Sequence, residues 1–371
     1  MMQVGIDATP LLGARSGVGQ YTLRLLAAQL ADPSGWHYHL YSNRPLEDLE
    51  PTLSKARLVS GYFPFSRAIW MQTRLPWSIR QNRPDLFHFT NASAPLVVPC
   101  PYVITIHDAS LFVYRELHPQ ARLVAIRLML PWVARRAAAI ITVSEHARRE
   151  LLRLLKLPPE KMFAIHEAAP AHYRPLTDPN HRRQLKEKYK LPDAFVLHVG
   201  TLEPRKNLVR LVAALAELHA RGHHATLVLA GPSGWKMEGF YEHVHSFGLG
   251  EYVRWLGYVP EPDLPGLYSL ARLFAYPSLY EGFGLPPLEA MACGLPVLSS
   301  SASALSEVCG DAALLIDPLD VGEIANGLEH LWTNESARRE LIQRGLVRAA
   351  SFSWERTARE TMTVYERALE L

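Results

Sequence analysis

Residues 194–208 read AFVLHVGTLEPRKNL, which is an apolar run, a loop with a glycine, a proline and two basic residues, and the beginning of a helix. A short continuous apolar run of this kind predicts a strand covered on both faces, as in parallel sheets whose connections are helices. Open α/β sheets bind their ligands beyond the carboxyl ends of their strands. The stretch therefore predicts a strand–loop–helix unit of a doubly wound fold, with a candidate site in the loop 200–208.

The same alternation of apolar runs and amphipathic segments extends over the whole chain. It restarts after 168–180 (AAPAHYRPLTDPN), so we expect two doubly wound α/β domains, at 1–170 and 171–352. The last helical segment, within 353–371, can cross back over the first domain and is assigned to it. The expected strands are 2–8, 36–42, 85–89, 102–107, 139–143, 161–166, 194–199, 225–230, 252–256, 273–276, 296–299 and 313–316, and the clearest helices are about 17–31, 118–137, 145–156 and 353–370.

The composition is that of a soluble globular protein. Of 371 residues, 48% are hydrophobic and 20% are charged, which supports two sizeable cores and excludes a disordered chain. The apolar runs are shorter than the ~18 residues of a membrane-spanning helix. The start, MMQVGIDATP, lacks the features of a secretory signal. Cys100, Cys293 and Cys309 form no C-x-x-C pair, which argues against disulfides or structural zinc. We therefore expect a reduced, cytoplasmic setting.

A basic, aromatic stretch lies at 51–84. The net charge of +3 combines a basic first half with a mildly acidic second half, and no acidic residue lies between Glu50 and Asp85. One interpretation is a solvated surface with aromatic anchors into the core; the other is a face for anionic lipid headgroups or an anionic lipid-linked acceptor. Nucleic acid is less favoured, because the net charge is low and no recognition motif is present. The stretch contains Lys55, Arg57, Phe63, Phe65, Arg67, Trp70, Arg74, Trp77, Arg80 and Arg83.

Helical spacing would place Trp70 and Trp77 on one face, with Arg67 and Arg74 close by. Pro76 argues against a single unbroken helix. We therefore expect a cluster here and not a regular amphipathic helix.

Two loops of the first domain follow expected strands. GARSGVG at 13–19 opens the first helix, and it is either an anion- or sugar-binding loop or a tight turn. It is not a dinucleotide fingerprint, because Thr22 stands where the third glycine would be. His107, at the end of 102–107, either has a structural role or contacts a sugar hydroxyl or a proton.

Two loops of the second domain carry charged residues. Arg205 and Lys206 fall at a helix start, where they either face one anion together or form a solvated pair. PSLYEGFGLPPLE at 277–289 carries Glu281 on a glycine-rich turn and Glu289 in the following helix. Each carboxylate can accept hydrogen bonds from the vicinal hydroxyls of a sugar or a ribose.

Three segments together resemble the retaining glycosyltransferases of family 4: GTLEPRKNL at 200–208, PSLYEGFGLPPLEAMACGLPVL at 277–298 and CGDAAL at 309–314. The resemblance covers nearly the whole chain and implies the GT-B fold, two Rossmann-like domains facing each other across a deep cleft. GTLEPRKN and HFTN at 88–91 look like the bacterial mannosyltransferases that build O-antigen and exopolysaccharide chains. One departure is Thr201, because many relatives have an arginine directly after the glycine.

The resemblance implies roles for individual residues. Arg205 and Lys206 would clamp the diphosphate, Glu281 would bind the donor sugar, and Glu289 would bind the nucleotide ribose. His107 would lie near the reacting face of the sugar. The residues expected to act in catalysis are Glu281, His107, Arg205 and Lys206. The residues expected to bind the donor are Gly17, Gly19, Arg205, Lys206, Tyr258, Val259, Glu281, Phe283, Gly284, Leu285 and Glu289. The candidates for acceptor or membrane contact are Asn91, Arg67, Trp70, Arg74, Trp77 and Arg80.

The implied reaction is sugar transfer with retention of configuration, from a nucleotide sugar such as GDP-mannose to a lipid-linked saccharide. The chain has no Asp-x-Asp motif, so we expect no metal or other cofactor. The expected place is the cytoplasm, with peripheral contact at the inner face of the membrane and no nucleic-acid partner. The alternatives are a UDP-sugar-dependent glucosyl- or galactosyltransferase, a sugar-nucleotide epimerase on the same fold, and a non-catalytic binding subunit.

Overall fold

The structure, a computed structural model, describes residues 2–13, 17–33, 35–46, 51–114, 120–235 and 237–370. The chain forms two compact units, which are best considered separately. Unit 1 is Met1–Glu167 with Ser353–Leu371, and unit 2 is Ala168–Phe352. Residues 168–170, which the sequence assigns to the first domain, belong to unit 2. The reason is that Glu167 is the last residue of the linker that pairs within unit 1, with His107.

Unit 1 is built on a parallel sheet. Its described residues form seven strands in the order β3-β2-β1-β4-β5-β6-β7. The alternation of strands with helices in the sequence produces this doubly wound order, because parallel neighbours need a crossover connection. The strands are β1 (Gln3–Asp7), β2 (His37–Ser42), β3 (Arg57–Ser60), β4 (Leu86–Phe89), β5 (Tyr102–Ile106), β6 (Ala139–Thr142) and β7 (Met162–Ala164).

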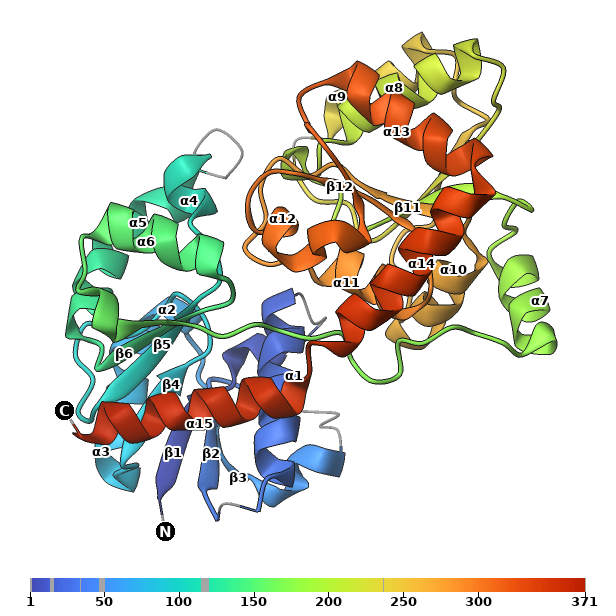
Figure 1. Cartoon of the computed structure of the whole chain (residues 1–371). Helices are drawn as coiled ribbons and strands as arrows, with labels where there is room; N and C mark the ends of the chain where they lie inside the picture. The colour runs from blue at the N-terminus through green and yellow to red at the C-terminus, as the bar shows by residue number, and fades with distance from the viewer. Residues whose placement is uncertain are drawn as a thin grey trace. The chain divides into compact units, whose positions relative to one another are not determined.

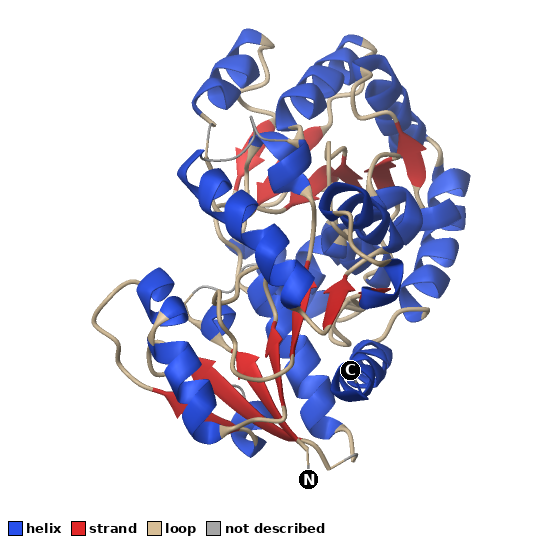
Figure 2. Ribbon diagram, turned by 90° about the vertical axis from the view of Figure 1, so that its left-hand side faces the viewer, coloured by secondary structure: helices blue, strands red, loops and turns tan. Residues whose placement is uncertain are grey.

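Helices flank this sheet (Figure 2). The C-terminal helix α15 returns to unit 1 as expected, and Figure 1 shows it in red beside α1. Met362, Val364 and Tyr365 of α15 join the hydrophobic core formed by the strands. The α-helices are α1 (Gly17–Ala31), α2 (Arg67–Gln72), α3 (Arg74–Asn82), α4 (Ser110–Val113), α5 (Gln120–Arg136), α6 (Glu145–Leu155) and α15 (Trp354–Glu370), and the 3-10 turns are η1 (Thr9–Leu11), η2 (Pro51–Lys55) and η4 (Pro159–Lys161).

Unit 2 repeats the plan with a parallel sheet. Its described residues form six strands in the order β10-β9-β8-β11-β12-β13. This order places β8 beside both β9 and β11, so the loops after these three strands emerge at the same edge. The strands are β8 (Phe195–Val199), β9 (Thr226–Ala230), β10 (Val253–Trp255), β11 (Leu273–Tyr276), β12 (Val297–Ser300) and β13 (Leu314–Ile316).

The helices of unit 2 cover its sheet with apolar faces. Leu211, Leu215 and Leu218 of α8 recur at helical spacing and are buried in the core with Ile324 and Leu328 of α13. The α-helices are α7 (Pro179–Lys188), α8 (Leu208–Ala220), α9 (Glu238–Ser246), α10 (Leu264–Leu270), α11 (Leu285–Ala292), α12 (Ala304–Cys309), α13 (Val321–Thr333) and α14 (Glu335–Ala350), and the 3-10 turns are η5 (Pro204–Lys206), η6 (Glu261–Asp263) and η7 (Gly310–Ala312).

The basic stretch departs from the simplest expectation in two places. It contains β3, a strand the sequence does not predict, because RLVS is short and largely exposed at the sheet edge. The helical part is broken between α2 and α3 at Thr73, whose backbone is not helical. Trp70 is therefore buried, with 4% of its surface exposed, whereas Trp77 is 47% exposed. The two tryptophans do not share a face.

Candidate active site

The loop after β8 packs tightly against the loop after β9. Gly231 has φ +142°, and a Cβ there would lie 2.0 Å from the carbonyl oxygen of Gly200, so only glycine permits this approach. The Leu202 N–H donates to Pro232 O, and the Gly234 N–H donates to Leu202 O. These backbone contacts hold the first part of the 200–208 loop in place without help from its side chains.

Asn207 ties this loop to two others. It adopts the left-handed conformation, with φ +61°, which asparagine tolerates better than most residues. Its Nδ2 donates to Pro277 O at 3.0 Å and to Pro318 O at 2.6 Å, and the Leu279 N–H donates to Arg205 O. The loops after β8, β11 and β13 are thus joined at the carboxyl edge of the sheet.

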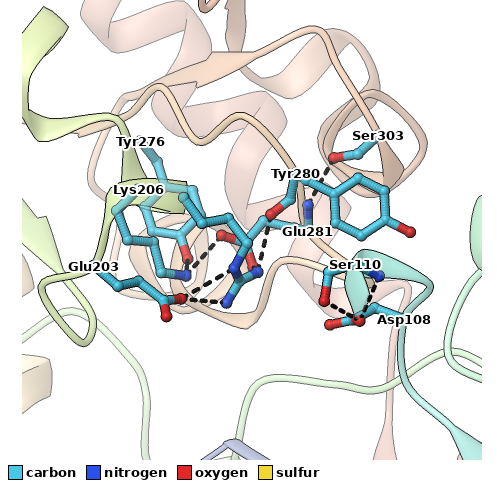
Figure 3. A network of polar contacts seen from close by, with 9 residues as sticks. Asp108, Ser110, Glu203, Lys206, Tyr276, Tyr280, Glu281 and Ser303 are labelled. Atoms are coloured by element: carbon cyan, nitrogen blue, oxygen red, sulfur yellow. Dashed lines mark hydrogen bonds and ion pairs between the residues drawn. The ribbon is translucent and has the colours of Figure 1, made fainter. Parts of the chain in front are cut away.

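A buried charge cluster lies on these loops (Figure 3). Lys206 Nζ lies 2.6 Å from Glu281 Oε1 and 2.6 Å from the Tyr276 hydroxyl. Arg205 Nη1 donates to Glu281 Oε2 at 2.7 Å, so each oxygen of Glu281 holds one cation. The Arg205 Nε and Nη2 both donate to Glu203 Oε1, at 3.0 and 2.7 Å. We call Glu203, Arg205, Lys206 and Glu281 the charge cluster.

The charges of the cluster shift each other's protonation. Burial alone would raise the pKa of Glu281, but Arg205 and Lys206 lower it to about 2, so the carboxylate stays ionised. Burial lowers the pKa of Lys206, and Glu281 partly offsets this effect. The neighbouring His198 on β8 has a pKa lowered to about 4 by burial, so it is neutral. The cluster is an ionised, water-poor arrangement suited to a ligand that carries both negative charge and hydroxyl groups.

Glu281 is held by a turn that precedes α11. The Ser303 Oγ accepts from the Glu281 N–H at 2.9 Å. Gly284 has φ +128°, which favours glycine, and α11 begins directly after it at Leu285. Phe283 is buried with 4% exposure and packs against Phe352. This segment presents Glu281 beside a helix N-terminus, as the sequence predicts.

Glu289 occupies the second turn of α11, where its Oε2 accepts from the Tyr268 hydroxyl at 2.9 Å. The loop after β10 carries Tyr258, which is 65% exposed, and Val259, which is buried. Only the Tyr258 side chain of that pair is accessible to a ligand.

The glycine loop of unit 1 is only partly described. Residues 14–16 lie outside the described residues, while Gly17 begins α1 and Gly19 is buried within it. Before the loop, the buried Asp7 accepts from the Thr9 N–H and hydroxyl, at 3.0 and 2.6 Å. The start of the loop is therefore anchored by a carboxylate that the sequence analysis does not single out.

His107 is held from both sides of its ring. Its Nε2 lies 3.0 Å from Thr90 O, and its Nδ1 lies 3.4 Å from Glu167 Oε1. Burial opposes protonation, but Glu167 raises the pKa of His107. A carbonyl and a carboxylate only accept hydrogen bonds, so these two partners favour a ring that donates from both nitrogens. Because its nitrogens are already used, His107 is not placed to accept a proton.

The residues proposed to contact the acceptor or the membrane differ in their burial and in their contacts. Arg67 forms an ion pair with Asp7 at 3.2 Å, and Trp70 packs into unit 1, so neither is a simple surface residue. Arg74 stacks over the exposed Trp77 ring at 3.8 Å, and Arg80 is exposed. In HFTN, the Asn91 side chain accepts from the Ala92 N–H at 2.7 Å.

Sequence reasoning misses three contributors to the site: Glu203, Asn207 and Tyr276. Glu203 and Asn207 lie inside the GTLEPRKNL segment, so their position next to Arg205 and Lys206 was the available signal. Tyr276 is the last residue of β11, and the rule that ligand contacts follow strand ends points to it as well.

Comparisons with known proteins relate both units to glycosyltransferases. Residues 15–170 match the model described as glycosyltransferase family 4, and residues 180–348 match that of glycosyl transferases group 1. The chain is 37% identical to the O-antigen chain mannosyltransferase B of Escherichia coli, over 98% of this chain and 100% of that protein. It is 35% identical to the serotype-specific mannosyltransferase WbdA of Escherichia coli over 63% of this chain, but it spans only 29% of that protein.

Among solved structures, sucrose-phosphate synthase from Thermosynechococcus elongatus superposes with a TM-score of 0.79, at 22% identity, and covers 99% of both chains. Two doubly wound units of this kind, with a charged loop cluster in the second, define a GT-B glycosyltransferase. The chain belongs to glycosyltransferase family 4.

Proposed function

We propose that this glycosyltransferase moves mannose from GDP-mannose to a lipid-linked saccharide during the synthesis of a cell-surface polysaccharide. The observation that carries the proposal is the relative matched over its full length, an O-antigen chain mannosyltransferase. The charge cluster supports it, because a nucleotide sugar presents a diphosphate to Lys206 and sugar hydroxyls to Glu281.

In this reaction the bond between the anomeric carbon and the donor phosphate oxygen breaks. The anomeric carbon bonds to the acceptor oxygen on the same face, which retains the configuration, and the acceptor proton passes to the departing phosphate. Lys206 and the amides at the start of α11 would stabilise the charge that develops on the diphosphate. Such a route needs no protein nucleophile.

Calorimetric titration tests the donor. We expect GDP and GDP-mannose to bind more tightly than UDP and UDP-glucose, and mannose to be transferred only when a lipid-linked saccharide is added. Tighter binding of the UDP compounds would replace the proposal with a UDP-sugar-dependent enzyme. Conversion of the sugar nucleotide without an acceptor would indicate an epimerase.

We expect transfer to continue in excess EDTA. In the part of the chain that the structure describes, no group of three or more His, Cys, Asp or Glu side chains is arranged to hold a metal ion. Lys206 of the charge cluster and the amides at the start of α11 can offset the charge of the diphosphate in place of a metal ion. The measurement is the initial rate of transfer with and without EDTA, and a loss of activity that manganese or magnesium restores would contradict the expectation.

We also propose that unit 1 docks on the membrane that holds the acceptor. No helix among the described residues is long and apolar enough to cross a membrane. The segment 93–97 links α2 and α5: the Trp132 Nε1 on α5 donates to Leu96 O, and the Leu96 N–H donates to Gln72 on α2. The proposed docking surface consists of the apolar residues of 65–97 and α5 that are at least 45% exposed: Phe65, Ile69, Trp77, Leu96, Val97, Leu128 and Trp132.

Changing Arg74, Arg80 and Arg83 together to serine should weaken binding to anionic vesicles. Each basic residue near an anionic surface contributes about 1 kcal/mol, so the triple variant should lose most of its salt-sensitive binding. Liposome co-sedimentation at low and high salt measures this, with neutral vesicles for comparison. The matched control changes the exposed, ion-paired Arg339, Arg344 and Arg356 to serine. Equal binding by both triple variants would remove membrane docking from this surface.

A further inference from the structure

Arg205 directs its guanidinium at protein groups. Its Nε and Nη2 donate to Glu203 Oε1, and its Nη1 donates to Tyr280 O at 2.9 Å and to Glu281 Oε2 at 2.7 Å. The contacts cover every nitrogen of the side chain. The resemblance to family 4 implies that Arg205 clamps the diphosphate, but a guanidinium held in this way would have to leave three partners to do so.

Glu203 is the residue that fixes this arrangement. It lies in the extended segment before η5 and is 3% exposed. It forms an ion pair with Arg205, and two donors of that guanidinium converge on one of its oxygens. A buried carboxylate of this kind requires compensation, which Arg205 supplies, so the pair holds the Arg205 guanidinium against Tyr280 and Glu281 of the loop after β11.

Lys206 differs from Arg205 in what holds it. Its ammonium contacts one oxygen of Glu281 and the neutral hydroxyl of Tyr276. A phosphate oxygen can replace Glu281 at Lys206 while Arg205 keeps its hold on the other oxygen of Glu281. The geometry therefore gives the two cations different roles. Lys206 can exchange Glu281 for a phosphate oxygen, whereas Arg205 keeps its protein partners.

We infer that Glu203 and Arg205 are a positioning pair that fixes Glu281 for the donor sugar, and that Arg205 is not a ligand of the diphosphate. The inference rests on the proposed role of Glu281 in sugar transfer, but it holds for any donor sugar and nucleotide. It predicts that a substitution of Glu203 or Arg205 lowers kcat but leaves the affinity for a sugar-free nucleotide unchanged.

The test measures turnover with the donor that the wild type uses, and the affinity for the matching sugar-free nucleoside diphosphate. We expect Arg205→Gln to lower kcat about 10²-fold and Glu203→Gln about tenfold, because Glu281 is misplaced rather than removed. The Kd of the nucleoside diphosphate should stay within about twofold in both variants. Lys206→Ala is the positive control for lost nucleotide affinity. Arg221→Gln, which breaks a surface ion pair with Glu329 in the same unit, is the matched control with wild-type values expected.

The pH profile of kcat/KM gives a readout that a structural role would not move. Glu281 is needed as a carboxylate, and in the wild type its pKa of about 2 lies below the working range. Removing the Arg205 charge raises this pKa, so the variant should begin to lose activity at a higher pH than the wild type as the pH falls. Arg205→Lys, which restores the charge, should return the acidic limb toward its original position.

A tenfold or greater loss of nucleotide affinity in Arg205→Gln, with normal folding, would overturn the inference and restore the clamp. An unchanged kcat in both variants would overturn it as well. If Arg205→Gln does not fold, Glu203→Gln decides, because it keeps the side-chain shape and an acceptor oxygen. Failure of mannose as the donor leaves the inference standing, since the comparison uses whichever donor the wild type accepts.

Discussion

Lys206→Ala should lose both sugar transfer and nucleotide binding. Lys206 is 6% exposed, its ammonium lies 2.6 Å from Glu281, and it stands at the end of η5, just before α8 begins. In a water-poor site, one fixed donor to a developing negative charge contributes about 2.7–4 kcal/mol, so turnover should fall about 10²–10³-fold. The Kd for GDP should rise at least about tenfold, because the proposed ligand of Lys206, the diphosphate, is part of the free nucleotide as well.

Steady-state transfer assays and calorimetry with GDP measure the two effects. Lys188→Ala is the matched control, because Lys188 also pairs with a carboxylate of unit 2, Asp263, but on the surface. Thermal unfolding shows whether the variant is folded, since leaving a buried partner unpaired can itself destabilise a protein. A folded Lys206→Ala enzyme with near-normal transfer would show that the lysine is not a ligand of the diphosphate.

Much of the fold follows from the order of apolar runs. The helix predicted at 17–31 is α1 with the same bounds, because its apolar residues keep helical spacing. The edge strand β3 escapes prediction, because four residues with an arginine and a serine carry no pattern of burial. The break at Thr73 also escapes it: Pro76 signals an interruption, but only packing decides that Trp70 turns inward and Trp77 outward.

The sequence predicts which residues form the candidate site, but it does not predict which of their side chains pair with each other. The strand-end rule places Arg205, Lys206 and Glu281 at one sheet edge, and the adjacency of β8 and β11 brings them together. The pairing within the set is not predictable, because it depends on which oxygen faces which cation. Glu203 is one more charged residue in the sequence, and only the structure shows that it holds Arg205.

Glu281→Gln should lower turnover far more than nucleotide binding. Its carboxylate is ionised and held between two cations, and the proposed role is to accept hydrogen bonds from the donor sugar. Without it turnover should fall about 10³-fold. Binding of GDP should not weaken, because the cluster becomes more positive and Lys206 loses its competing carboxylate. Glutamine keeps the size of the side chain, so a thermal unfolding curve separates loss of function from loss of the fold.

Glu289→Gln should weaken nucleotide binding more than it lowers turnover. Glu289 lies further along α11 than Glu281, beside the Tyr268 hydroxyl, and its proposed ligand is the ribose. Losing one charged acceptor costs about 1.5–3 kcal/mol, so the Kd for GDP should rise about tenfold or more, with a smaller effect on kcat at saturating donor. Glu340→Gln, an exposed glutamate of the same unit that pairs with Arg344, is the control for both variants. Because free GDP carries the ribose but not the sugar, its calorimetric Kd separates the two roles. Equal losses of GDP affinity in Glu281→Gln and Glu289→Gln would show that the two carboxylates do not divide the donor in this way.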